Sequence, residues 1–205
     1  SGKYSIVEGK FTEVQSPEKY KGRYFETESD FLTQILVDEF GVDAVINTGI
    51  AGSLNAQIDI GDIVISTDVL HHDMDAVNFG YAPGQIPQME VFSFVADEPM
   101  AELAEKVCHQ VNPEIKVFRG RVVSGDQFIS DKSVKDAIIS EFGGFAVEME
   151  GAAIGQAAYL NHIPFLVVRA ISDKADGSAH MDYAEFEMAA IEHSVKLTVR
   201  MIQEL

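Results

Sequence analysis

Four side chains able to do acid–base or binding chemistry fall within one stretch of the chain, Phe145 to Asp176. Glu148 and Glu150 precede a run of small residues at helical spacing, and Ser172 and Asp173 follow a nearly unbroken apolar run. Ligands of open α/β sheets bind beyond the carboxyl ends of the strands, so these groups are expected to hold a small polar ligand. Acids near a helix start also serve as caps that complement the helix dipole, and the stretch alone leaves both interpretations open.

The elements that position these groups are predicted as strand, helix, strand. Phe145–Val147 is a short apolar strand, and Gly151–Leu160 has the spacing of a helix. Pro164–Ile171 is apolar except for Arg169, which favours a strand buried on both faces. A buried arginine needs an acidic partner, and one of the two glutamates of this stretch is the candidate.

The rest of the chain continues the alternation of strands and helices. The expected helix caps are Asp30, Asp97, Asp131 or Ser130, and Asp182. Gly49–Ser53 is an expected loop, and His71–Pro87 is a long segment without periodicity, typical of a binding loop. The pattern predicts one α/β domain over residues 1–205, with a mixed, mostly parallel sheet flanked by helices. The other expected helices are Phe31–Phe40, Asp97–Val111, Asp131–Phe142 and Met181–Leu205, and the other expected strands are Asp43–Thr48, Asp62–Ser66 and Ile115–Ser124.

Composition excludes several classes of partner. The formal charge of −18 argues against nucleic acid and anionic membrane surfaces, which need a basic protein surface. No apolar run approaches the roughly 18 residues of a membrane span. Cys108 is the only cysteine, so a disulfide framework is impossible and a cytoplasmic location is expected.

Taken together and in order, several short motifs resemble the nucleoside phosphorylase superfamily, and most closely its methylthioadenosine/S-adenosylhomocysteine nucleosidases. The resemblance covers about residues 33 to 205, and its most specific motifs are VEMEGAAIG and VVRAISDKAD. It implies cleavage of the N-glycosidic bond of an adenine nucleoside, with release of adenine and with no metal or other cofactor. The matching pieces are INTGIAGSL (46–54), GDIVIS (61–66), HHDMDAVNFGY (71–81), VSGDQFI (123–129), FAVEMEGAAIGQ (145–156) and PFLVVRAISDKAD (164–176).

The resemblance also implies roles for individual residues. Asp173 would protonate N7 of adenine, and Ser172 would help to hold its carboxyl group. Glu150 would bind the ribose hydroxyls, and Met149 would lie under the ribose. The other residues that the resemblance places in or near the site are Glu148, Phe128, which would stack on adenine, Ile129, Ile50, Gly52, Arg169, and the parts that enclose the 5′-alkylthio group, Phe186, Val77 and Phe79.

One position bears on the attacking group. Phosphorylases similar to this chain carry an arginine where Asn47 stands, and an asparagine cannot supply that positive charge to phosphate, so water is the expected nucleophile. His71, His72, Asp73 and Asp75 do not have the spacing of a standard metal site, and an interface or pocket loop is favoured for them. The resemblance implies a homodimer, and the apolar loop after His71 supports it.

The amino-terminal part departs from the resemblance. Residues 1–30 contain neither the GAM-x-x-E-like loop, whose glutamate activates water, nor the Gly-rich turn that precedes the first helix. The native N-terminal strands are therefore expected to be missing or replaced, for instance by a hairpin over Tyr4–Val14, and hydrolysis is expected to be impaired. The alternatives are an inactive protein that binds adenine nucleosides and a purine nucleoside phosphorylase.

Overall fold

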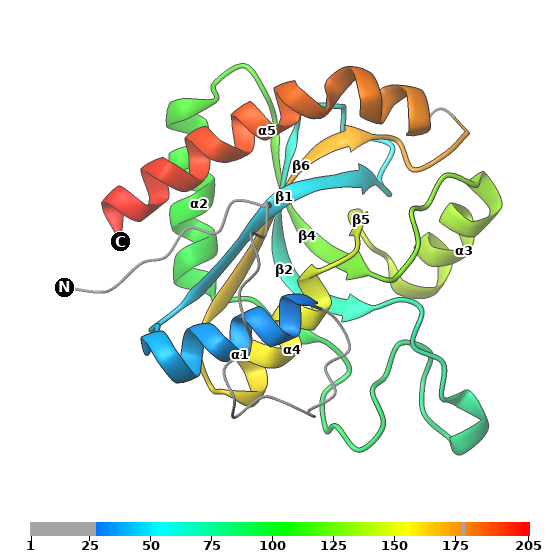
Figure 1. Cartoon of the computed structure of the whole chain (residues 1–205). Coiled ribbons are helices and arrows are strands. Elements are labelled where there is room, and N and C mark those ends of the chain that lie inside the picture. The colour runs from blue at the N-terminus through cyan, green and yellow to red at the C-terminus, as the bar shows by residue number, and fades with distance from the viewer. Residues whose placement is uncertain (1–27, 178) are drawn as a thin grey trace.

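The computed structural model describes residues 28–177 and 179–205 and shows one mixed sheet flanked by helices (Figure 1). Within these residues, no helix is long and apolar enough to cross a membrane. The hairpin expected over Tyr4–Val14 lies outside the described residues. The elements are α1 (Glu28–Phe40), β1 (Val45–Ser53), β2 (Ile63–His71), the 3-10 helix η2 (Val77–Phe79), β3 (Phe94–Val95), α2 (Glu98–Val111), β4 (Val117–Ser124), α3 (Lys132–Phe142), β5 (Ala146–Glu148), α4 (Gly151–Leu160), β6 (Phe165–Asp173) and α5 (Ala179–Glu204).

The sheet has the strand order β3-β2-β4-β5-β1-β6. Its two long pairings, β1 with β6 and β2 with β4, are parallel, and so is the pairing of β4 with β5. The segment Ile63–Ile65 of β2 also pairs with β6 in antiparallel fashion, so the strands from β2 round to β6 close on themselves. This arrangement confirms the predicted α/β domain with a mixed, mostly parallel sheet.

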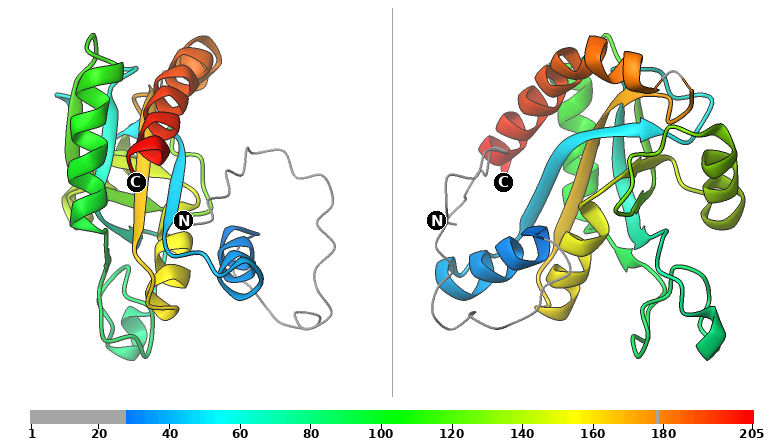
Figure 2. Two further views of the ribbon diagram at one scale, coloured as in Figure 1. Left: turned by 90° about the vertical axis from the view of Figure 1, so that its left-hand side faces the viewer. Right: turned by 45° about the vertical axis from the view of Figure 1, so that its right-hand side comes forward.

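Two groups of helices cover the sheet. α5 packs on β6 and β1 and against α2, whereas α4 packs on β2 and β4 and against α1 (Figures 1 and 2). Close packing of α4 depends on its small residues: a Cβ at Gly155 would lie 2.5 Å from Cγ2 of Val69 in β2. The helix therefore lies directly on the sheet, and its first residues follow β5 without a long connection.

The carboxyl end of β1 differs from the prediction. Gly49–Ser53 is not a loop, because β1 continues through it in register with β6, with Gly49 opposite Arg169 and Gly52 opposite Asp173. Small residues resemble a loop in sequence, but here the neighbouring strand supplies the hydrogen bonds. The register of this pairing shifts between Ala51 and Gly52.

Several element boundaries also differ. α1 begins at Glu28 and α5 at Ala179, so Asp30 and Asp182 lie inside their helices and do not cap them. β2 extends to His71, well past the predicted end, because β4 pairs with it along nearly its whole length. Two predicted caps are confirmed, since Asp97 accepts a hydrogen bond from Met100 N, and Asp131 accepts two from the first turn of α3.

Candidate active site

The carboxylate of Glu148 lies at the end of β5, buried beneath the first turn of α4. Its oxygens accept hydrogen bonds from the backbone N–H of Gly151 at 2.9 and 3.0 Å and from that of Glu150 at 3.2 Å. The hydroxyl of Ser124 and Nη2 of Arg169 also donate to it. These donors give both oxygens of the buried carboxylate hydrogen-bond partners, which offset the loss of hydration on burial.

Arg169 holds together the polar groups on this side of the site. Its side chain is 3% exposed, and Nη2 donates to Glu148, to Asn47 Oδ1 and, at 3.4 Å, to Glu150 Oε2. A Cβ at position 49 would overlap Nη1 of Arg169, so only glycine fits there without moving the guanidinium group. The predicted ion pairing of this arginine with the glutamates is confirmed.

Glu150 is the more accessible of the two carboxylates, with a side chain 47% exposed. Partial burial raises its pKa above the ordinary value of 4.5, the Arg169 guanidinium opposes this rise, and the Glu148 carboxylate adds to it. Glu150 directly precedes α4, and the hydrogen bond from its backbone N–H to the Glu148 carboxylate fixes its backbone there. The carboxylate is thus held at one side and open to a ligand at the other.

Asp173 ends β6 and is only 2% exposed. Ser172 donates its hydroxyl to Oδ2 at 2.9 Å, and the backbone N–H of Ala175 donates to Oδ1 at 2.7 Å. A Cβ at Gly52 would lie 2.9 Å from Oδ1, so the bare backbone of β1 comes close to this carboxyl group. The predicted contact between Ser172 and Asp173 is present.

The two acidic centres are separated along β1. Arg169, which binds Glu150, is the partner of Gly49 in the register, and Asp173 is the partner of Gly52. Three residues of extended strand span roughly 10 Å. Arg169, with the Glu150 that it binds, and Asp173 therefore lie at two different positions along a strand of small residues, where they can contact two different parts of one elongated ligand.

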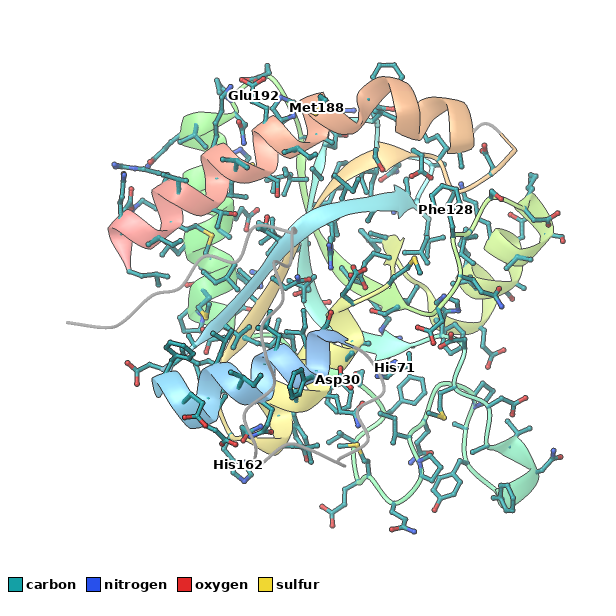
Figure 3. The ribbon with its side chains drawn as sticks, in the orientation of Figure 1. Asp30, His71, Phe128, His162, Met188 and Glu192 are labelled. Carbon is teal, nitrogen blue, oxygen red and sulfur yellow. The ribbon has the colours of Figure 1, made fainter. Side chains whose placement is uncertain are left out.

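The remaining residues expected near a ligand differ in their exposure. Phe128, in the loop between β4 and α3, is 43% exposed and is labelled in Figure 3, whereas Ile129 beside it is buried. Met149 is 40% exposed between the two glutamates, and Ile50 in β1 is partly buried. Phe128 and Met149 are therefore the two large apolar side chains of this set that are exposed by 40% or more.

The residues expected around the 5′ group are not brought together. The segment between β2 and β3, which carries η2, projects from the body of the domain, and α5 lies at the opposite side in every view (Figures 1 and 2). Phe79 is 84% and Val77 43% exposed, while Phe186, in the first half of α5, is partly buried. Within one chain, Val77 and Phe79 do not approach Phe186.

The histidines and aspartates at the end of β2 make hydrogen bonds and packing contacts with neighbouring parts of the chain. His71, labelled in Figure 3, shares a 3.1 Å hydrogen bond with Gln156. Asp73 accepts a hydrogen bond of 2.8 Å from the backbone N–H of Asp126. The ring of His72 packs against Gly125, and its burial lowers its pKa below 6.5, more than the Asp73 carboxylate raises it. Over the described ranges, no three His, Cys, Asp or Glu side chains are grouped as metal ligands.

Comparison with known proteins identifies the family of this site. A profile described as "Phosphorylase superfamily" matches residues 27–203. The chain belongs to the phosphorylase superfamily. It is 40% identical over 174 residues to the 5′-methylthioadenosine/S-adenosylhomocysteine nucleosidase of Staphylococcus carnosus, covering 84% of this chain and 75% of the relative. A nucleosidase of the same name from Bacillus cereus strain B4264 is 41% identical over the same length and is covered to 74%.

Solved structures give the same result for this superfamily member. The Neisseria meningitidis nucleosidase of that name, in complex with methylthio-immucillin-A, has a TM-score of 0.82 and 37% identity, with 86% of this chain and 76% of that chain covered. The futalosine hydrolase of Helicobacter pylori has a TM-score of 0.81 and 33% identity, with 86% and 75% covered. The resemblance to methylthioadenosine/S-adenosylhomocysteine nucleosidases is confirmed.

Two groups that contact the buried carboxylates of this phosphorylase-superfamily protein have no role assigned from sequence. Ser124 ends β4 and contacts Glu148, and the backbone of Ala175 donates to Asp173. A polar residue closing an apolar strand is the only signal for the serine. A backbone donor leaves no signal in the sequence.

Proposed function

We propose that this chain hydrolyses the N-glycosidic bond of 5′-methylthioadenosine or S-adenosylhomocysteine and releases adenine. The observation that carries the proposal is the separation of a ligand-accessible carboxylate, Glu150, from a buried one, Asp173, along the small-residue strand β1. The nucleosidases to which the chain is similar act, by name, on these two nucleosides.

The two carboxyl groups take different parts of the reaction. Glu150 accepts hydrogen bonds from the ribose hydroxyls, and its negative charge stabilises the positive charge that develops on the ribosyl ring. Asp173 donates a proton to N7 of adenine, so that the electrons of the breaking C–N bond are accepted by a neutral leaving group. Water adds to the anomeric carbon and releases a proton through solvent, which replaces the proton lost by Asp173 and leaves adenine and the free sugar as products.

Apolar contacts hold the rest of the substrate. Phe128 stacks on the adenine ring, Ile129 contacts its edge, and Met149 lies under the ribose. Gly52 and Ile50 belong to the strand over which the ribose passes, and Arg169, held by Glu148, keeps Glu150 in place. Val77 and Phe79 of one chain and Phe186 of another enclose the 5′-alkylthio group.

Hydrolysis is favoured over phosphorolysis by the charges around Arg169. Nη2 of its guanidinium group is engaged with Glu148, Glu150 and Asn47, and two carboxylates accompany one cation. A phosphate dianion needs cationic donors that are free to bind it. Asn47 adds an acceptor to the network where a phosphorolytic site needs a donor with a positive charge.

We propose further that the chain acts as a cytoplasmic homodimer in methionine salvage. Phe79 and Val95, which are 84% and 75% exposed, leave apolar surface on the projecting segment and on β3. A second chain that covered this surface would bring its own η2 to the neighbouring active site. Sedimentation of the purified protein, with Phe79→Asp as the variant expected to dissociate, tests the dimer.

The experiment that tests the activity is incubation of the purified chain with 5′-methylthioadenosine, with and without inorganic phosphate. Adenine and free methylthioribose, formed at the same rate in both, are the expected products. The rate is expected to lie below that of the S. carnosus relative assayed beside it, because residues 1–30 carry no water-activating glutamate motif. Strict dependence on phosphate would contradict hydrolysis, and tight nucleoside binding without adenine release would favour a binding protein.

A further inference from the structure

Ser124 connects three parts of the structure through one hydroxyl group. It ends β4, is 2% exposed, and lies opposite Glu148 in the parallel register of β4 and β5. Its Oγ accepts a hydrogen bond from the backbone N–H of Ala152 at 2.7 Å and donates one to Oε1 of Glu148. The hydroxyl therefore fixes the first turn of α4 and the buried carboxylate relative to β4.

The neighbours of Glu148 give this hydroxyl its importance. The Oε2 atom of Glu148 accepts from Arg169, which also donates to Glu150, so Glu148 and Glu150 share one guanidinium group. The hydroxyl of Ser124 donates to Oε1 and stabilises the charge of Glu148. The guanidinium group of Arg169 is then less strongly attracted to Glu148 and can also interact with Glu150. The same serine, through Ala152, holds the start of the helix that Glu150 precedes.

We propose that Ser124 is a positioning residue for the ribose-binding carboxylate: through Glu148 and Ala152 it sets the place of Glu150 and its share of the Arg169 charge. This inference rests on the proposed nucleosidase function. It gives Ser124 no contact with the substrate. Removal of the hydroxyl deprives the buried N–H of Ala152 and Oε1 of Glu148 of one hydrogen-bond partner each. When these two groups shift to find other partners, Arg169 and Glu150 shift with them.

The test is Ser124→Ala, with Ser124→Thr as the variant that retains the hydroxyl. The matched control is Ser66→Ala, because Ser66 is also a fully buried strand serine whose Oγ accepts a backbone N–H, that of Val167 at 3.0 Å. Ser66 has no hydrogen bond to a carboxylate among the described residues. A thermal melt of each variant separates loss of stability from loss of function.

We expect kcat/KM for 5′-methylthioadenosine to fall about 10- to 100-fold in Ser124→Ala, as for other groups that orient a directly bound ligand. The pH profile carries the sharper result. Arg169 lowers the pKa of Glu150, so a guanidinium drawn toward Glu148 leaves that pKa higher and moves the acid limb of kcat/KM to higher pH. Ser124→Thr should restore both kcat/KM and the position of the acid limb. Ser66→Ala should lower the melting temperature by a similar amount but change neither kcat/KM nor the acid limb.

Binding of methylthio-immucillin-A, measured by calorimetry between pH 5 and 8, separates this inference from the proposed function. If the wild type binds the analogue without releasing adenine from substrate, hydrolysis fails, and the loss of affinity in Ser124→Ala still tests positioning. If the wild type is active and Ser124→Ala matches Ser66→Ala in rate, affinity and acid limb, the positioning role is overturned. A wild type that neither binds the analogue nor releases adenine overturns both.

Discussion

Glu148 and Arg169 form an ion pair in which both side chains are almost completely buried, 2% and 3% exposed. Glu148 ends β5, whereas Arg169 lies in the middle of β6, and these two strands are not neighbours in the sheet. Glu150 shares the same guanidinium group from the ligand side. One cation is therefore shared by a buried carboxylate and by the carboxylate that we propose binds the ribose.

The first prediction concerns the stability of this ion pair. Glu148→Gln leaves Arg169 buried without its main counter-charge and should lower the free energy of unfolding by about 3–5 kcal/mol. Arg169→Met should cost a similar amount, and the double variant less than the sum, because the two changes remove one interaction. Urea unfolding measures all three. Glu192→Gln, in the exposed pair with Lys196, is the control and should unfold nearly as the wild type does. Additive losses would contradict a direct coupling.

The second prediction concerns Asp173. Asp173→Asn can still accept the hydrogen bond of Ala175 N but has no acidic proton for N7, so adenine release should fall about 10²- to 10⁴-fold. Affinity for methylthio-immucillin-A should change far less than the rate, because the shape of the pocket is retained. Initial rates and calorimetry give the two quantities. The exposed Asp43→Asn is the control, and a variant of Asp173 with ordinary turnover would show that another group protonates the base.

The third prediction concerns Glu150. Glu150→Gln exchanges charge-assisted hydrogen bonds to the ribose for neutral ones, and kcat/KM should fall about 10- to 150-fold. Since the pKa of Glu150 lies above 4.5, the wild type loses ribose binding as pH falls through that raised value, and the variant should lose this acid limb. Rates between pH 4.5 and 8 test it, with the exposed Glu141→Gln as control. An unchanged limb would assign it to another group.

Much of the scaffold that holds these residues could be predicted from sequence. Gly151–Leu160 is a helix with the predicted bounds, and Asp97 and Asp131 cap their helices as expected. Local signals were sufficient there, because helical spacing and caps depend on residues a few positions apart. The burial of Arg169 in an apolar strand also required an acidic partner, and the structure supplies it.

The errors come from pairings between distant residues. Gly49–Ser53 has the composition of a loop, yet β6 pairs with it and makes it a strand. The role of Ser124 depends on the register of β4 and β5, which places it opposite Glu148, and no local pattern reports a register. The segment that carries η2 projects away from the domain (Figure 2), so the enclosure of the 5′ group by Val77, Phe79 and Phe186 stays a prediction for a pair of chains.

The last prediction uses His72, whose ring packs against Gly125 beside the loop that leads to Phe128. Burial lowers the pKa of His72 in the folded protein below the unfolded value of 6.5. As pH falls below 6.5, the unfolded chain therefore binds a proton at His72 more readily than the folded chain does. Stability contributed by the neutral ring is present above pH 6.5 and is lost as pH falls toward the lowered pKa. His72→Phe, which keeps a ring but cannot titrate, should therefore reduce the fall in melting temperature between pH 7 and pH 5. The exposed His109→Phe should retain the full fall, and an equal pH dependence in the two variants would mean that His72 is protonated in the folded protein as easily as in the unfolded chain.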